Sequence, residues 1–289
     1  ISVQLIKKAC LCRLFCLYAL VRENGPMSAI NSNHPSSPLL TVQDGVATLT
    51  LNRPAHRNRL QDSDLDALLG QFAQIDADPS VRVLVLRANT EGQPRPVFCA
   101  GYDIGGFEQD AQASSAFERV PDALAALRPV TICALNGSLY GGATDLFLAC
   151  DLRIALQGVE FRMPATALGL HFYPSGLLRY VERLGLAAAK RAFLTGRPFS
   201  AEQLWQTGCL EALAAPEQFE AELQSLLADV LAMAPRTLEA IKRSLNEIAA
   251  GCHDPVELRQ REHASTRSAD FAEGRKAFAE RRRPVFTGQ

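Results

Sequence analysis

Three stretches of the sequence join small residues to polar side chains that could take part in chemistry. In residues 97–104 (VFCAGYDI), an apolar run ends in Ala-Gly, where a ligand could approach the backbone closely. Residues 129–155 carry glycines ahead of a helical pattern, and residues 161–176 form a loop that contains His171 and Tyr173. An ordinary strand-end turn is the alternative explanation of the first stretch.

In the second stretch, a buried strand leads into Asn136-Gly137, then Gly141-Gly142, and then a helix. Free N–H groups at the start of a helix favour developing negative charge, such as that of an oxyanion. Asp145 lies one turn after Gly142, and helical side chains lean toward the N-terminus, so its carboxylate is directed toward such a site. The alternative is that the glycines serve close packing and that Asp145 is an ordinary first-turn acid.

The elements that must position these stretches alternate between strand and helix. Residues 39–42 and 46–51 are alternating apolar runs around Asp44-Gly45, which predicts a β-hairpin. A helix follows, with Ser63 as its expected N-cap. Three apolar runs predict buried strands over residues 81–86, 130–135 and 152–155. A helix is expected over residues 142–150, between the last two of these strands. This alternation predicts an α/β fold.

The last third of the chain has a helical pattern. Residues 200–203 (SAEQ) form a capping box that opens a short helix, which Gly208 ends. An apolar stripe at helical spacing follows over residues 219–231, and residues 235–281 are similarly helical. We therefore expect a leader or tail over residues 1–38, an α/β core over residues 39–199 and a helical region over residues 200–289.

The composition narrows the class of partner. The 289 residues include 30 basic and 31 acidic ones, so the net charge of −1 favours neither nucleic acid nor an anionic membrane. Eight cysteines occur without a CxxC pair or a zinc-site spacing, and Cys99, Cys133 and Cys150 lie in apolar runs. These patterns predict no metal site and buried, reduced thiols, which are typical of a cytoplasmic protein.

The first 26 residues differ from the rest of the chain. Lys7 and Lys8 precede an apolar run over residues 9–21, which Arg13 interrupts. The run is too short and too charged to span a bilayer. We expect an extension upstream of a start at Met27, and a targeting segment is the alternative.

Taken together and in this order, the motifs resemble those of the crotonase superfamily, the enoyl-CoA hydratase/isomerase family. Residues 98–103 match FxAGxD, residues 134–151 match AxNGxxxGGxxxLxxxCD, and residues 161–176 correspond to FxxPExxLGxxPxxG. Residues 194–202 match LTGRxxxAxE, and residues 273–288 match the terminal EGxxAFxEKRxPxFxG. The resemblance extends over residues 39–288.

This resemblance implies a spiral of ββα units with a helical C-terminal region that forms trimers, often paired as hexamers. It also implies an acyl-CoA substrate and no required cofactor, since coenzyme A arrives as part of the substrate thioester. The implied oxyanion hole consists of the backbone N–H groups of Tyr102 and Gly142, which would hold the thioester oxygen. Residues expected along the CoA or near its phosphates are His56, Arg57, Arg59, Ala100, Gly101, Asp103 and Ile104.

The sequence departs from the hydratase pattern at the two glutamates that activate water. Asp145 stands at the first position and Ala165 at the second, and alanine can neither take nor deliver a proton. We therefore expect Asp145 to be the acid/base and hydration to be inefficient. His171 and Tyr173 are further catalytic candidates, because methylmalonyl-CoA decarboxylase resembles this chain in this loop and has histidine at the Tyr102 position. Alternatively, these side chains simply wall the acyl pocket.

Three interpretations of the function stay open at this point. The first is an enzyme of the enoyl-CoA hydratase/isomerase type that works through an enolate. The second is an acyl-CoA decarboxylase or thioester hydrolase on the same scaffold, with His171 or Tyr173 guiding the substrate. The third is a non-catalytic oligomer that binds acyl-CoA.

Overall fold

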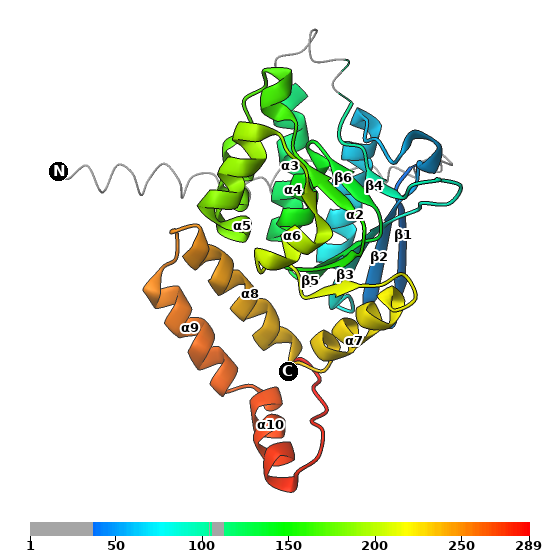
Figure 1. Ribbon diagram of the computed structural model, residues 1–289. Helices are drawn as coiled ribbons and strands as arrows, with labels where there is room; N and C mark the ends of the chain where they lie inside the picture. The colour runs from blue at the N-terminus through cyan, green and yellow to red at the C-terminus, as the bar shows by residue number, and fades with distance from the viewer. Residues whose placement is uncertain (1–36, 104, 106–112) are drawn as a thin grey trace, which may run out of the picture. The chain divides into compact units, whose positions relative to one another are not determined.

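The computed structural model describes residues 37–103, 105 and 113–289, which fall into two compact units (Figure 1). The first unit runs to Val230, and the second begins at Leu231. The boundary predicted from the sequence at residue 200 is the point after which the chain is mainly helical, and it differs from the boundary between the two units. After residue 200 a further strand, β10 (Ala212–Ala214), still pairs with a strand of the first unit, β7 (Leu152–Leu156).

The first unit alternates strands and helices, as the sequence predicts. Its other strands are β1 (Leu39–Gln43), β2 (Val46–Leu51), β3 (Val83–Ala88), β4 (Val97–Cys99), β5 (Val130–Leu135), β6 (Ser138–Tyr140), β8 (Glu160–Arg162) and β9 (Phe199–Ser200). Its helices are η2 (Pro54–His56), α2 (Asp62–Ala77), α3 (Ala113–Ala126), α4 (Ala143–Ala149), η3 (Ala165–Leu168), α5 (Pro174–Thr195), α6 (Ala201–Gln206) and α7 (Phe219–Leu231).

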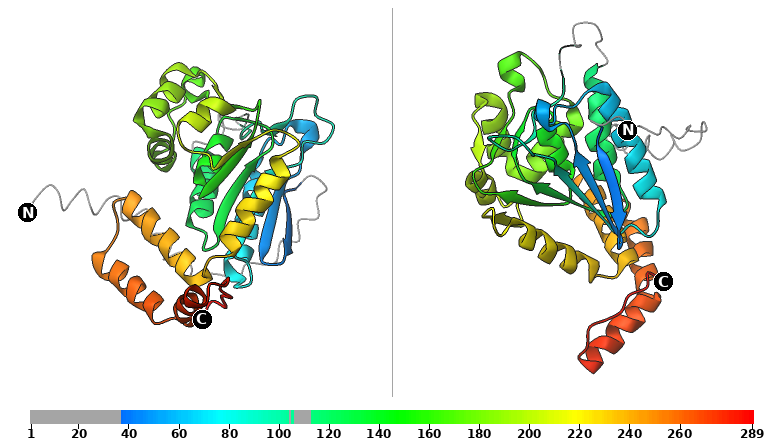
Figure 2. Two further views of the ribbon diagram at one scale, coloured as in Figure 1. Left: turned by 60° about the horizontal axis from the view of Figure 1, so that its bottom comes forward. Right: turned by 90° about the vertical axis from the view of Figure 1, so that its right-hand side faces the viewer.

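The strands form two sheets. The larger sheet has the order β1-β2-β3-β5-β7-β10, in which the β1–β2 hairpin is antiparallel and every other pairing is parallel. The smaller sheet has the order β4-β6-β8-β9, with β8 and β9 antiparallel. Helices α2, α3 and α4 pack beside the strands (Figure 1 and Figure 2). An Arg87–Glu220 ion pair of 2.6 Å joins β3 to α7. One core cluster contains buried residues of both sheets, such as Leu84 of β3 and Phe161 of β8, so the two sheets share one α/β core.

Local sequence signals explain most of these elements. Asp44 and Gly45 have φ values of 51° and 80°, the left-handed geometry that the predicted two-residue hairpin turn requires. The predicted capping box is confirmed, since the Ser200 hydroxyl accepts from the Gln203 N–H at 3.3 Å. The predicted N-cap of α2 is wrong: Gln61 holds that position, because the Asp64 carboxylate accepts from the Gln61 N–H at 2.9 Å.

The core of the first unit is formed by the apolar runs that the sequence singles out. Every residue of β5 is buried, which fits a central strand covered on both faces. Cys99, Cys133 and Cys150 are fully buried among these apolar side chains, as predicted. Burial raises the pKa of Cys99 to about 12, so this thiol stays protonated at neutral pH. No helix in the described part of the chain is long and apolar enough to cross a membrane.

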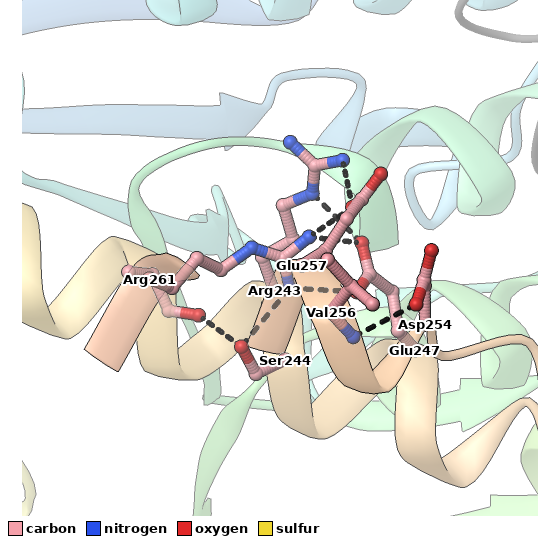
Figure 3. Close-up of polar contacts among 8 residues, drawn as sticks. Arg243, Ser244, Glu247, Asp254, Val256, Glu257 and Arg261 are labelled. Carbon is pink, nitrogen blue, oxygen red and sulfur yellow. Dashed lines mark hydrogen bonds and ion pairs between the residues drawn. The ribbon is translucent and has the colours of Figure 1, made fainter. Parts of the chain in front are cut away.

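The second unit consists of helices α8 (Pro235–Ala249), α9 (Pro255–Thr266) and α10 (Ala269–Glu280). Arg261 of α9 binds Glu247 of α8 through two hydrogen bonds of 2.6 and 2.9 Å, and Arg243 donates to the same carboxylate at 2.8 Å (Figure 3). Burial would raise the pKa of Glu247, but these hydrogen bonds lower it below its usual value. The charge of Glu247 therefore stabilises the folded state above the usual carboxyl pKa, and this contribution is lost as the pH falls through the lowered value.

Replacing Glu247 by Gln is expected to lower the free energy of unfolding by about 1–2 kcal/mol, because charge-assisted hydrogen bonds become neutral ones. Denaturant unfolding at neutral pH measures this change. Glu262→Gln is the matched control, since Glu262 forms an exposed pair with Arg259 and its loss is expected to cost less than about 0.5 kcal/mol. Equal losses in the two variants would contradict a special role of the Glu247 network.

Candidate active site

A cavity of about 250 Å³ lies where the three stretches predicted to carry chemistry meet. Part of its wall is formed by residues 100–102 and residues 140–142. The other lining residues are mostly apolar: Phe117, Met163, Pro164, Ala165, Leu168, Leu170, His171, Phe172 and Tyr173. An apolar cavity with a few polar groups is typical of a small-molecule site.

The two glycine stretches lie side by side because β4 and β6 are parallel neighbours. A Cβ atom on Gly101 would lie only 3.0 Å from the Tyr140 carbonyl oxygen, and the φ of Gly101 is +101°. Gly141 is also left-handed, with a φ of +60°. Glycine at 101 therefore permits the close approach of the two backbones, and glycine at 141 permits the left-handed geometry there.

The Tyr102 and Gly142 amides belong to these adjoining stretches. The Leu60 N–H donates to the Gly101 carbonyl, and the Asp103 N–H donates to the Leu60 carbonyl. Leu60 thus pairs with the residues on either side of Tyr102. In a parallel bridge of this kind the middle residue, Tyr102, points its own N–H away from Leu60, toward the edge on which β4 pairs with β6. Gly142 is the N-cap of α4, and its N–H has no acceptor among the residues that the structure describes.

Asp145 is fully buried, and both of its carboxylate oxygens accept hydrogen bonds. Arg179 of α5 donates from Nε to Oδ1 at 2.8 Å and from Nη2 to Oδ2 at 2.5 Å. The Tyr173 hydroxyl donates to Oδ2 at 2.7 Å. Asp145 is not a lining residue, whereas Tyr173 is, so the carboxylate is linked to the cavity through the phenol.

The charges of this cluster follow from its contacts. Burial and the negative charge of Asp145 raise the pKa of Tyr173 well above its usual value, so the phenol is neutral. Burial alone would lower the pKa of Arg179, but Asp145 and Asp122 raise it, so the guanidinium is a cation. Arg179 also donates to Asp122 at 2.7 Å. The cluster therefore combines one cation, two carboxylates and a neutral phenol.

The position of the Tyr173 ring depends on Gly176, in the first turn of α5. A Cβ atom on Gly176 would lie 2.3 Å from Cε1 of Phe172 and 2.6 Å from Cε2 of Tyr173. The two rings pack against each other at a tilt of 30°, with centroids 4.1 Å apart. A side chain at residue 176 would therefore displace both rings from the cavity wall.

Replacing Gly176 by Ala is expected to lower the free energy of unfolding by about 1–3 kcal/mol, because the added methyl group overpacks the site. It should also lower turnover of an acyl-CoA substrate. Thermal unfolding and steady-state kinetics measure the two effects. Gly70→Ala is the control: Gly70 lies within α2, a Cβ atom there would meet nothing within 4 Å, and alanine should stabilise by about 0.5–1 kcal/mol. Unchanged stability of Gly176→Ala would contradict this packing argument.

His171 and Ala165 also line the cavity. His171 is exposed, and its Nδ1 lies 2.7 Å from the Phe172 carbonyl oxygen. Because a carbonyl oxygen only accepts, Nδ1 carries the proton of this hydrogen bond. Ala165 is buried, so this part of the wall is apolar.

The residues expected near CoA occupy the neighbouring part of the first unit. His56 and Arg57 are exposed, and the Arg57 carbonyl accepts from the Ala100 N–H at 2.9 Å. Arg59 forms an ion pair with Asp103 at 3.1 Å. Ala100 and Gly101 line the cavity, whereas Ile104 lies outside the described residues.

Sequence reasoning missed the partners that surround Asp145. Arg179 and Asp122 lie far from it in the sequence, and neither belongs to a recognisable motif. The Tyr102 hydroxyl donates to the Asp62 carboxylate, which no sequence pattern indicates either.

Comparisons with known proteins identify the family of the chain. Residues 41–289 match the family model described as enoyl-CoA hydratase/isomerase. The chain is 34% identical over 260 residues to the mitochondrial enoyl-CoA hydratase domain-containing protein 2 of Bos taurus, and the match covers 85% of each chain. It is 30% identical to the 1,2-epoxyphenylacetyl-CoA isomerase of Escherichia coli, over 86% of this chain and 97% of that protein.

Solved structures show the same fold. An enoyl-CoA hydratase/isomerase family member superposes with a TM-score of 0.78 at 27% identity, over 87% of this chain and 98% of the other. An enoyl-CoA hydratase/carnithine racemase from Magnetospirillum magneticum gives a TM-score of 0.79 at 25% identity, over 87% and 96%. The predicted crotonase-like fold is thereby confirmed. This chain belongs to the enoyl-CoA hydratase/isomerase family.

Proposed function

We propose that the protein forms an enolate from an enoyl-CoA thioester and moves a proton along its acyl chain, as an isomerase of this family would. The supporting observation is the cavity in which the Tyr102 and Gly142 stretches adjoin beside the Tyr173 ring. The two N–H groups would bind the thioester oxygen and stabilise the charge that develops there. His56, Arg57 and Arg59 are proposed to bind the CoA phosphates.

Asp145 is the proposed acid/base, and it acts through Tyr173. The phenolic oxygen takes a proton from the acyl carbon while its own proton passes to the Asp145 carboxylate, 2.7 Å away. The electron pair left on the acyl carbon moves to the thioester oxygen. Reversal of these steps at another carbon returns the proton and completes the isomerisation. His171 is proposed as a second polar group that positions the acyl chain.

Ala165 favours proton transfer over addition of water. Hydration needs one group to activate water and another to deliver a proton to carbon. The methyl group of Ala165 does neither, although it lines the cavity. A decarboxylase has less support, because the Tyr173 proton is already donated to Asp145 and would have to be redirected toward a substrate carboxylate.

Assays of the purified protein with 3-enoyl-CoA, crotonyl-CoA and methylmalonyl-CoA test this proposal. We expect isomerisation of 3-enoyl-CoA to be the fastest reaction, and Asp145→Ala and Tyr173→Phe to slow it by about 10²–10⁴-fold. Fast hydration of crotonyl-CoA, or carbon dioxide release from methylmalonyl-CoA, would contradict it. Binding of these thioesters without any turnover would favour the non-catalytic alternative.

A further inference from the structure

The hydrogen bond between Asp145 and Tyr173 has a direction that the cation beside it determines. A buried carboxyl group and a phenol can share a proton either way, since a protonated acid could donate to the phenolic oxygen. Arg179 places two N–H groups on the Asp145 carboxylate, at 2.8 and 2.5 Å, and therefore favours its charged form. A carboxylate can only accept, so Tyr173 must be the donor.

The guanidinium is itself held in this orientation. Its Nη1 donates to Asp122 at 2.7 Å, and its Nη2 lies 3.4 Å from the Ser175 hydroxyl, which donates to Glu118 at 2.8 Å. Arg179 and Asp145 have side chains that are 9% and 0% exposed. Solvent therefore does not compete strongly for these hydrogen bonds.

Removal of the cation would reverse the bond. An isolated carboxylate in such a buried site carries a large desolvation cost, and it avoids this cost by taking up a proton. The protonated Asp145 would then donate to the Tyr173 oxygen, which would leave the phenolic proton to point elsewhere. The Tyr173 hydroxyl would then present a donor, instead of an acceptor, to the cavity.

We infer that Arg179 is a positioning residue that fixes the direction of the Tyr173–Asp145 hydrogen bond and so makes the Tyr173 oxygen an acceptor toward the cavity. The inference rests on the proposed function, in which Tyr173 meets the acyl group. An acyl group with a hydroxyl beside Tyr173, which can donate, should therefore bind better than one with a keto oxygen at the same carbon, which can only accept. A phenol that donated toward the cavity would bind either oxygen, so a preference for hydroxyl over keto reports the acceptor.

The test is calorimetric binding of two matched ligand pairs: 2-hydroxybutyryl-CoA with 2-oxobutyryl-CoA, and 3-hydroxybutyryl-CoA with 3-oxobutyryl-CoA. The wild-type protein should bind one of the hydroxyl ligands about tenfold more tightly than its keto partner. Arg179→Met should abolish this preference, and so should Tyr173→Phe, which leaves the ion pair in place. Arg183→Met, a half-buried arginine one turn later on α5, is the matched control and should keep the preference.

Each outcome bears on the inference. A wild-type protein without any hydroxyl preference, or a preference that persists in Tyr173→Phe, would overturn it. A folded Arg179→Met protein that keeps the full preference would overturn the role of Arg179. If Arg179→Met does not fold, the binding preference of Tyr173→Phe tests the inference in its place. Butyryl-CoA separates this result from the proposed function: its failure to bind the wild-type protein would contradict acyl-CoA binding itself.

Discussion

Replacing Gly142 by Pro in a Phe117→Leu background is expected to lower kcat by about 10²–10³-fold relative to Gly142→Ala in the same background. Proline removes the N–H group that we propose binds the thioester oxygen, whereas alanine keeps it. The φ of Gly142 is −55°, which proline can adopt. The background is needed because a Cβ atom on Gly142 would lie 2.8 Å from Cε1 of Phe117.

Steady-state kinetics with 3-enoyl-CoA measures this difference, after circular dichroism has shown that both variants fold. The loss should appear mainly in kcat, because the amide interacts more strongly with the developing oxyanion than with the ground-state carbonyl. Equal kcat values for the proline and alanine variants would show that the Gly142 amide does not stabilise the transition state.

Replacing Arg179 by Met is expected to lower the free energy of unfolding by about 3–5 kcal/mol, because it leaves the buried Asp145 without its cation. The pair is enclosed, with side-chain exposures of 9% for Arg179 and 0% for Asp145. Denaturant unfolding of the wild-type and variant proteins measures the change.

The double variant Asp145→Asn/Arg179→Met separates stability from chemistry. It removes both charges, so most of the stability should return. Turnover should stay at least about 10²-fold below wild type, because an amide at residue 145 cannot take the proton that Tyr173 hands on. A double variant with full activity would limit this ion pair to a structural role.

The features that could be predicted from the sequence are those set by neighbouring residues. The hairpin at Asp44-Gly45 and the capping box at Ser200 depend on contacts over a few residues, and both are confirmed. Serine is a common N-cap, which favours a start of α2 at Ser63, but the Gln61–Asp64 pair satisfies the same backbone groups. The smaller sheet could not be predicted, since its strands have two or three residues and pair only with strands that are distant in the sequence.

The candidate site was predictable to a similar extent. The glycines at 101 and 141 predict that a ligand could approach the backbone there, and both residues line the cavity. The position of Asp145 on α4 indicates where its carboxylate lies, but not that Arg179 encloses it, because that contact joins two helices through residues 34 positions apart. Spacing along a chain reports neighbours within an element, whereas the partner of a buried charge is set by tertiary packing.

The proposed oxyanion hole is tested most directly with butyryl-CoA that carries ¹³C at the thioester carbonyl. The vibrational frequency of that carbonyl is measured with the ligand bound to the protein. Two hydrogen bonds from the Tyr102 and Gly142 amides would polarise the carbonyl, so its stretching frequency should be lower when bound than in water. The shift should shrink when Pro replaces Gly142 in the Phe117→Leu background. A bound frequency equal to or higher than that in water would contradict the proposed oxyanion hole.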